Sequence, residues 1–411
     1  MKKILIFGAM LCMFAACSKT EVKEPKSLQF SAAEKQMVNE CNAFSFNLLT
    51  QVAANEEQEN IVLSPLSASM LLGMLMNGAD GETLAQIQAV TGFGAEASID
   101  DINAYYLQLI QVLPDLDAYT NVGIANGIWV KEQFPVYEAF MQACKQNFDA
   151  QAKNVPTFVD DKVLKDINDF AAQHTNNRIN QIINRGMVSE ETMMVLLNAL
   201  YFKALWKDKF DKNYTLQQTF TTLKDAKIQV DMMRLYDKRQ LYAETEDCQL
   251  VELPYKGDQY VADIILPAKD TDILTWVKTL DAERWQQLIK GIYSTEVNLG
   301  LPKFKLNYER ELTDDLAALG MPAAFTPFAD FSRLSELPTY ISLIKQKTFI
   351  QVDEEGTEAA AVTIGIDVAA SAGPDYVKEF IADRPFLFVI RERTYGTILF
   401  TAIIGHPEWQ K

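Results

Sequence analysis

Histidine is nearly absent from this chain, which has only His174 and His406 among its 411 residues. A Ser-His-Asp triad would need one of these rings beside a serine held on a strained turn, and the turn sequence Gly-x-Ser-x-Gly does not occur. The phosphate loop GxxxxGK(S/T) and the zinc pair HExxH are missing as well. We therefore expect no catalytic residues, no metal site and no cofactor, and we do not expect an enzyme.

Basic residues are also scarce, because none occurs between Gln36 and Val130. The whole chain has 38 lysines and arginines and 55 aspartates and glutamates, so its net charge is 38 − 55 = −17. A surface of this sign repels the phosphate backbone of DNA and RNA, and nucleic acid is not an expected partner.

Cysteine occurs without a pattern that predicts a disulfide framework. Cys12 and Cys17 lie near the N-terminus, and Cys41, Cys144 and Cys248 are far apart in the rest of the chain. Three is an odd number, and no pair has the short spacing of a zinc or redox motif. We predict that these three cysteines are small buried hydrophobic residues.

The N-terminus has the composition of an export signal. Residues 1–3 are Met-Lys-Lys, and an apolar run from Ile4 to Ala16 follows, which is shorter than the roughly 20 residues that span a bilayer. The sequence Phe14-Ala15-Ala16-Cys17 resembles a bacterial lipobox, although Phe14 stands where leucine is usual. We predict a lipoprotein signal peptide over residues 1–16 with Cys17 as the lipidated residue. The alternative is a plain secretory signal cleaved near Ala16.

If Cys17 carries lipid, the protein is exported and anchored to a bacterial membrane, on its periplasmic or its cell-surface face. The polar stretch after Cys17 contains Pro25, and we predict a flexible tether over residues 17–30. Ser31 and Glu34 have the spacing of a capping box and predict the start of a helix. No Pro/Gly/Ser-rich linker or repeat follows, so residues 31–411 are predicted to form one large domain.

A segment near the C-terminus has an unusual run of small residues, Glu354-Glu355-Gly356-Thr357-Glu358-Ala359-Ala360-Ala361-Val362-Thr363. Side chains alternate along a strand, so one face of an extended segment would carry the uncharged residues Thr357, Ala359, Ala361, Thr363 and Gly365. Glu358 falls on the opposite face. The pattern predicts a strand that can be buried on one side without clashes, with Gly356 as a flexible pivot.

Three other segments are distinctive. Residues 60–67, Asn-Ile-Val-Leu-Ser-Pro-Leu-Ser, predict a strand that runs into a helix capped by Ser64 or Ser67. Residues 194–202 form an apolar run typical of a central strand, which continues to Phe210, and Asp383-Arg384-Pro385-Phe386 precedes another apolar run.

In these segments and in their order, the chain resembles the serpin family of protease inhibitors over residues 31–407. The resemblance implies a single α+β domain with three β-sheets and about nine helices, and a long exposed reactive-centre loop. It also implies a mechanism, since inhibitory serpins offer that loop as bait to a serine or cysteine protease. The protease becomes acyl-linked to the cut loop, whose hinge then inserts as a new strand of the largest sheet and distorts the enzyme.

The resemblance assigns a role to individual positions of the loop. The hinge comprises Glu355, Gly356, Thr357, Glu358, Ala359, Ala360 and Ala361. The family's register places the reactive bond between Ala370 and Ser371, and cleavage after Val368 or Ala369 is the alternative. Small residues there suit an elastase-like protease, and subtilisin- or papain-like enzymes are further targets. A trypsin-like enzyme is not expected, because no lysine or arginine occurs between Lys347 and Lys378.

Other positions match the family's control points. Ser64, Ser67 and Asn198 match the shutter beneath the sheet, where Gln346 stands in place of the usual histidine, and Trp206 matches the breach where insertion begins. The stretch without basic residues covers the usual site for sulfated polysaccharides, so no heparin-type cofactor is expected. We expect a monomer whose partner is its target protease. The alternative is a non-inhibitory serpin that acts as a binding or chaperone-like module.

Overall fold

A computed structural model describes residues 25–94, 97–357 and 377–410 of the chain. Within these ranges nine α-helices are present, in agreement with the predicted number. The helices are α1 (Ala32–Asn55), α2 (Pro65–Met76), α3 (Gly81–Thr91), α4 (Ile99–Val112), α5 (Glu138–Phe148), α6 (Asp161–His174), α7 (Ile273–Val277), α8 (Ala282–Lys290) and α9 (Thr313–Leu319). Short 3-10 turns lie at Leu113–Asp115, Arg185–Met187, Lys212–Tyr214 and Pro322–Phe325.

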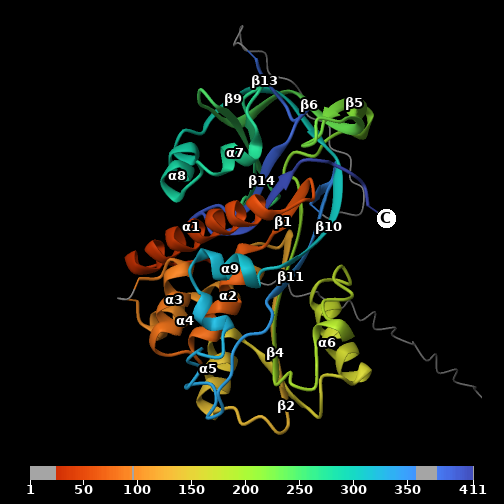
Figure 1. Ribbon diagram of the computed structural model, residues 1–411. Coiled ribbons are helices and arrows are strands. Elements are labelled where there is room, and N and C mark those ends of the chain that lie inside the picture. Colours follow the sequence, from red (N-terminus) through yellow and green to blue (C-terminus); the bar gives the residue numbers. More distant parts are fainter. Residues whose placement is uncertain (1–24, 95–96, 358–376, 411) are drawn as a thin grey trace, which may run out of the picture.

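The strands of the described residues form two sheets. They are β1 (Asn60–Leu63), β2 (Thr120–Lys131), β3 (Gln151–Val155), β4 (Met194–Leu205), β5 (Leu216–Thr221), β6 (Lys227–Glu244), β7 (Cys248–Pro254), β8 (Tyr260–Pro267), β9 (Tyr293–Pro302), β10 (Phe304–Glu311), β11 (Lys345–Val352), β12 (Gly356–Thr357), β13 (Lys378–Ile381), β14 (Phe386–Glu392) and β15 (Ile398–Ile404). Helices and sheets are segregated, so the predicted α+β class is confirmed (Figure 1).

The nine-stranded sheet has the order β1-β15-β14-β8-β7-β6-β9-β13, and β5 pairs with β6. β6 is 18 residues long and pairs with β5 over its first part, with β9 along most of its length and with β7 at its end. The predicted fold has three sheets, one large and two smaller. In the structure the strands of the two smaller sheets form one continuous sheet, because β6 and β9 extend through both of them. A bulge in β6 between Leu235 and Lys238 marks the place where they meet.

The six-stranded sheet has the order β10-β11-β12-β4-β2-β3. Its strand β4 is apolar on both faces because both are covered, by α6 on one side and by α2 on the other (Figure 1). Leu197 and Ala199 pack into the cluster beneath α6, whereas Leu200 and Phe202 point into the main core. The predicted central strand over residues 194–202 is confirmed and extends to Leu205.

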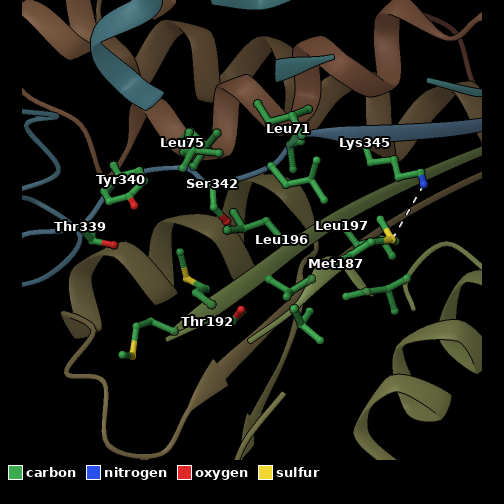
Figure 2. Close-up of a pocket in the computed structure, with 18 of the residues that line it drawn as sticks. Leu71, Leu75, Met187, Thr192, Leu196, Leu197, Thr339, Tyr340, Ser342 and Lys345 are labelled. Carbon is green, nitrogen blue, oxygen red and sulfur yellow. Dashed lines mark hydrogen bonds between the residues drawn. The ribbon is translucent and has the colours of Figure 1, made fainter. Parts of the chain in front are cut away.

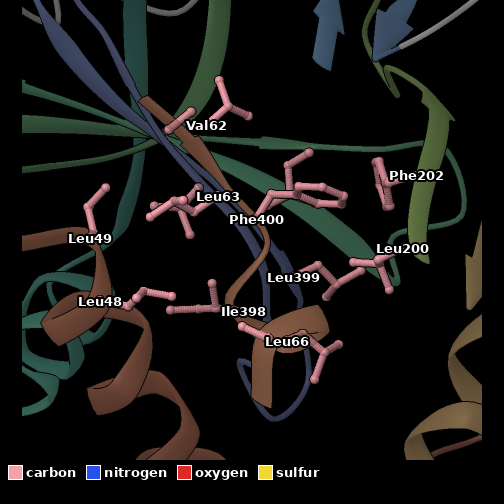
Figure 3. Packing of buried hydrophobic residues seen from close by; sticks show 14 of the residues in the cluster. Leu48, Leu49, Val62, Leu63, Leu66, Leu200, Phe202, Ile398, Leu399 and Phe400 are labelled. Atoms are coloured by element: carbon pink, nitrogen blue, oxygen red, sulfur yellow. The ribbon is translucent and has the colours of Figure 1, made fainter. Parts of the chain in front are cut away.

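The main core joins the two sheets through the N-terminal helices. Leu48 and Leu49 of α1 pack beside Leu63 of β1, and the apolar side chains of β15 fill the space toward Leu200 and Phe202 of β4 (Figure 3). Cys41, Cys144 and Cys248 are free and buried, as predicted. Burial raises the pKa of Cys41 and that of Cys144 to about 12, so neither thiol is a reactive thiolate at neutral pH. In the ranges given above, no helix is both long and apolar enough to cross a membrane.

The start of the folded body differs from the prediction. The capping box is present, with Ser31 Oγ accepting from Glu34 N at 3.2 Å and Glu34 Oε2 accepting from Ser31 N at 2.7 Å. The flexible tether predicted over residues 17–30 is wrong for residues 25–30, because Leu28 and Phe30 are buried. The ring of Phe30 lies 4.8 Å from that of Tyr395, between ring centroids. The signal peptide 1–16, Cys17 and the rest of the predicted tether lie outside the described residues.

Replacing Phe30 by alanine tests this attachment. We expect Phe30→Ala to lower the free energy of unfolding by about 3 kcal/mol, since it removes a buried aromatic ring. Gln29→Ala is the matched control, because Gln29 is exposed, and its effect should stay within about 0.5 kcal/mol. Urea unfolding of both variants measures the difference, and equal midpoints would contradict the packing of residues 25–30 on the body.

Candidate functional site

A gap one strand wide divides the six-stranded sheet. β12 is described over Gly356 and Thr357, after which the described residues end, and it is hydrogen-bonded to β11 on one side and to β4 on the other, with Thr357 opposite Val352 and Ala204. Below Ala204, β4 pairs only with β2, and below Val352, β11 pairs only with β10, as far as the described residues show. Among the described residues, the facing edges of β4 and β11 therefore have no partner strand apart from β12.

A cavity of about 460 Å³ occupies this gap. Its walls are mainly apolar, with Leu71 and Leu75 projecting from α2 and Leu196 lying on β4 (Figure 2). The segment that carries Thr339 to Lys345 forms another wall. Polar side chains also contribute to the lining, and Ser67, Asn198 and Gln346 are among them. The cavity can therefore accept an apolar extended segment between the two strands.

The hinge is held at the mouth of the gap by two carboxylates. Glu354 is 4% exposed and accepts hydrogen bonds from Lys303 Nζ and from Thr215 Oγ1, the latter at 2.8 Å. Burial alone would raise the pKa of Glu354, but Lys303 and Thr215 outweigh it and hold the pKa below its ordinary value. A hydrogen bond from Lys209 lowers the pKa of Glu355, aided by the charges of Lys209 and Lys212. Both carboxylates are thus charged at neutral pH.

Trp206 and Tyr255 form the floor beneath the hinge. Trp206 follows β4 and donates its indole N–H to Asp353 O at 2.9 Å and its backbone N–H to Glu355 O at 2.9 Å. Its ring stacks on that of Tyr255, with 4.6 Å between centroids and 8° between planes. The hydroxyl of Tyr255 lies 2.6 Å from Thr357 Oγ1, so it fixes the first inward-facing residue of the hinge.

Only glycine fits at position 356, because the backbone of β4 leaves no room for a side chain. A Cβ at this position would lie 2.1 Å from Ala204 O and 2.7 Å from Leu205 Cα, which no side chain can occupy. Its φ of 158° is close to the extended range. The sequence predicted a pivot that needs backbone freedom, whereas the structure shows a close approach of β12 to β4 as the reason for glycine.

Two of the predicted shutter residues, Ser64 and Gln346, are in direct contact. Gln346 accepts from Ser64 N at 2.9 Å and donates to Ser64 O at 2.8 Å, so both ends of its amide are engaged. Ser64 Oγ donates to Leu399 O at 3.0 Å, and Ser67 N lies 3.4 Å from Ser64 Oγ. These bonds tie β11 to the start of α2 beneath the gap.

Asn198 lies across the gap from that pair and has a different partner. Its amide nitrogen donates to Asn126 Oδ1 at 2.7 Å, and Asn126 in turn donates to Phe148 O at 2.7 Å. The carbonyl oxygen of Asn198 is buried and accepts no hydrogen bond from any described residue. The predicted shutter is therefore two groups on opposite sides of the gap, and Asn198 is not bonded to Ser64 or Gln346.

Sequence reasoning missed several residues of the site. Asn126 could have been found, because it is the one polar side chain in the run from Val122 to Val130. Tyr255 and Lys303 gave no signal, since their roles depend on strands that approach only in the fold. Of the predicted loop residues, Glu358, Ala359, Ala360, Ala361, Val368, Ala369, Ala370 and Ser371 lie outside the described residues.

Neither histidine is placed for nucleophilic catalysis. His174 ends α6, and its Nδ1 lies 2.8 Å from the carbonyl of Phe170 on the same helix. His406 follows β15, and its Nδ1 lies 3.2 Å from Glu59 Oε2. Over the part of the chain that the structure describes, no group of three or more His, Cys, Asp or Glu residues is able to hold a metal ion.

The chain is similar to known proteins along nearly its whole length. A family model described as Serpin (serine protease inhibitor) matches residues 39–407. A serpin-like protein of Methanosarcina acetivorans is 31% identical, and the alignment covers 100% of this chain and 97% of that protein. The leukocyte elastase inhibitor of Homo sapiens is also 31% identical, with coverage of 91% of this chain and 100% of that protein.

Solved structures agree with these sequence relatives. The crystal structure of the thermophilic serpin tengpin in the native state has a TM-score of 0.82 and 32% identity, and covers 94% of this chain and 97% of its own. Human thyroxine-binding globulin complexed with thyroxine has a TM-score of 0.82 at 24% identity, covering 92% and 100%, a likeness of fold alone. A family match of this extent, with relatives of this coverage, shows that the chain belongs to the serpin family.

Proposed function

We propose that this serpin inhibits elastase-like serine proteases by loop cleavage and strand insertion, and that subtilisin- or papain-like enzymes are further targets. Members of the family are typically protease inhibitors. The observation that carries the proposal is the position of β12, whose Thr357 is already paired on both sides, with Val352 of β11 and with Ala204 of β4. On this proposal the chain acts as a consumed bait and not as an enzyme.

The register of β12 indicates how the rest of the loop would fit. Thr357 pairs with Ala204, so an antiparallel continuation brings residue 367 opposite Met194, where β4 begins. Ten further residues, 358–367, would thus fill the gap, and at roughly 1 kcal/mol for each new backbone hydrogen bond the step gains on the order of 10 kcal/mol. Such a gain makes insertion irreversible and makes the uncut form metastable, held by a kinetic barrier.

The choice of protease follows from the loop sequence. Ala370 precedes the proposed reactive bond and Ser371 follows it, with cleavage after Val368 or Ala369 as the alternative. A protease with a shallow specificity pocket accepts alanine or valine, and the similarity to the leukocyte elastase inhibitor supports this choice. The rival proposal, a binding or chaperone-like module, requires no insertion.

Several further expectations belong to the same proposal. The protein acts as a monomer toward its protease, and it needs no sulfated polysaccharide, because residues 36–130 contain no basic side chain. It is exported and tethered to a bacterial membrane by lipid on Cys17.

Incubation with a pancreatic-type elastase tests the inhibitory function. We expect a complex that survives a denaturing gel, whose mass is that of the protease plus the chain up to residue 370, because the acyl bond is trapped before hydrolysis. Trypsin should give no such complex by cutting the loop. If elastase merely cuts the loop and the cut protein gains no thermal stability, the binding-module proposal is favoured.

The inward face of the hinge provides a second test. Thr357 is buried against Tyr255, so Thr357→Arg should place a charge in the path of insertion and convert the inhibitor into a substrate. Thr357→Ser keeps the small volume and the hydroxyl, and serves as the matched control that still inhibits. The number of inhibitor molecules consumed for each protease inactivated measures the effect. A Thr357→Arg variant that inhibits as efficiently as its parent is incompatible with hinge insertion.

The membrane anchor has a separate test. In the native host, Cys17→Ala should move the protein from the membrane fraction to the soluble fraction, because the acyl chains are the anchor. Cys41→Ala is the control, since Cys41 is a buried core residue and should leave the distribution between fractions unchanged. If the Cys17→Ala protein remains in the membrane fraction, the anchor lies elsewhere.

A further inference from the structure

Two buried carboxylates face each other across neighbouring strands of the nine-stranded sheet. Glu252 of β7 is directly opposite Asp263 of β8 in the strand register, and their side chains are 6% and 0% exposed. Like charges at directly opposed positions of a sheet repel each other, and burial removes the water that would weaken the repulsion. The pair therefore needs a compensating cation or a proton.

A single buried cation, Arg391 of β14, contacts both carboxylates. Its Nε donates to Asp263 Oδ2 at 2.6 Å, and its Nη2 donates to Glu252 Oε2. Burial would lower the pKa of Arg391, but the charges of Asp263 and Glu252 outweigh it and raise the pKa, so the guanidinium stays charged. One fully buried positive charge therefore compensates two negative charges in the interior of the sheet.

Further charged groups connect this cluster to the surface. Arg393 Nε lies 3.3 Å from Glu252 Oε1, and Arg393 Nη1 donates to Asp258 Oδ1 at 3.2 Å. Asp258 Oδ2 in turn accepts from Lys207 Nζ at 2.7 Å. The side chains become more exposed along this path, from 0% at Asp263 to 34% at Arg393 and 51% at Lys207. The second cation near Glu252 is thus partly hydrated, and it compensates the interior less than a buried one would.

Two other titratable groups lie near these charges. Tyr255 follows β7 and stays neutral, because burial raises the pKa of its hydroxyl and the charge of Asp263 raises it further. Glu392 adjoins Arg391 in the chain and accepts backbone N–H groups from the turn that follows it. Burial raises the pKa of Glu392 as well, so its titration must be separated from that of Asp263 by comparing variants that all keep Glu392.

From this arrangement we propose that Asp263 is a proton-binding switch inside the nine-stranded sheet, which takes up a proton in mildly acidic surroundings and thereby strengthens the pairing of β7 with β8. A proton on Asp263 removes the repulsion from Glu252 and leaves Arg391 to Glu252 alone. The paired strands support the floor beneath the hinge, since Tyr255, which stacks on Trp206, directly follows β7. The switch does not require cleavage of the loop, so it goes beyond the proposed function.

Mild acid should stabilise the folded protein through Asp263. Burial raises the pKa of Asp263 from 3.8 to about 6, while the charge of Arg391 opposes this shift and that of Glu252 adds to it. The folded state then binds the proton more tightly than the unfolded chain does. The resulting stability is fully present below the unfolded value of 3.8 and is lost as the pH rises through about 6. Between pH 7 and pH 5, the folding equilibrium constant should gain about tenfold from this group.

Urea unfolding of the full-length uncleaved protein at pH 7 and at pH 5 tests the switch. In Asp263→Asn a neutral amide of the same shape stands for the protonated acid. We expect the folding equilibrium constant of the parent to rise about tenfold relative to that of this variant between pH 7 and pH 5. Asp258→Asn is the matched control, because it removes a carboxylate at the exposed end of the same path, and its difference from the parent should stay constant.

Glu252→Gln gives a second reading if Asp263→Asn does not fold. It removes the opposing carboxylate and leaves Arg391 to Asp263, which then keeps its charge to a lower pH, so the parent should gain relative to this variant as well. If the parent has the same pH dependence as Asp263→Asn, or as Glu252→Gln where only that variant folds, Asp263 stays ionised and the proposal is overturned. Inhibition of a protease is not part of the measurement, so failure of the proposed function leaves the result unaffected.

Discussion

The open edges of β4 and β11 are the constraint on which the rest of this structure depends. Backbone donors and acceptors at an unpaired strand edge favour the addition of a further strand. Each residue of the added strand can form hydrogen bonds with them, which lowers the free energy of the sheet. β12, as far as it is described, occupies the first two positions of that row. On the proposed function, the sheet is more stable once a strand has been added between β4 and β11.

Electrostatic contacts fix the start of the hinge at the end of the six-stranded sheet. Glu354 is buried beside Lys303, and Glu355 is bonded to Lys209, so two anchored carboxylates directly precede the residue at which the chain enters the sheet. Gln346 ties β11 to Ser64 on the opposite side of the gap from Asn198. Removing one partner of a buried ion pair leaves the other charge buried without compensation. A few such pairs are therefore enough to oppose displacement of the hinge.

Sequence reasoning succeeded where the information is local. The capping box at Ser31 and the central strand from Met194 follow from short patterns with a direct physical meaning. It failed for the tether at Leu28 and Phe30, because only the fold supplies an apolar surface for them. It also failed for Tyr255 and Lys303, since their partners are about 100 and 50 residues away in the chain.

The control groups of the gap do not include one that titrates near neutral pH. The amides of Gln346, Asn198 and Asn126 have no proton to gain or lose in this range. The hinge carboxylates have pKa values below their ordinary ones, so they stay charged at neutral pH. A change of protonation in these groups therefore does not release the hinge. On the proposed function, cleavage of the loop is the event that frees the strand to move.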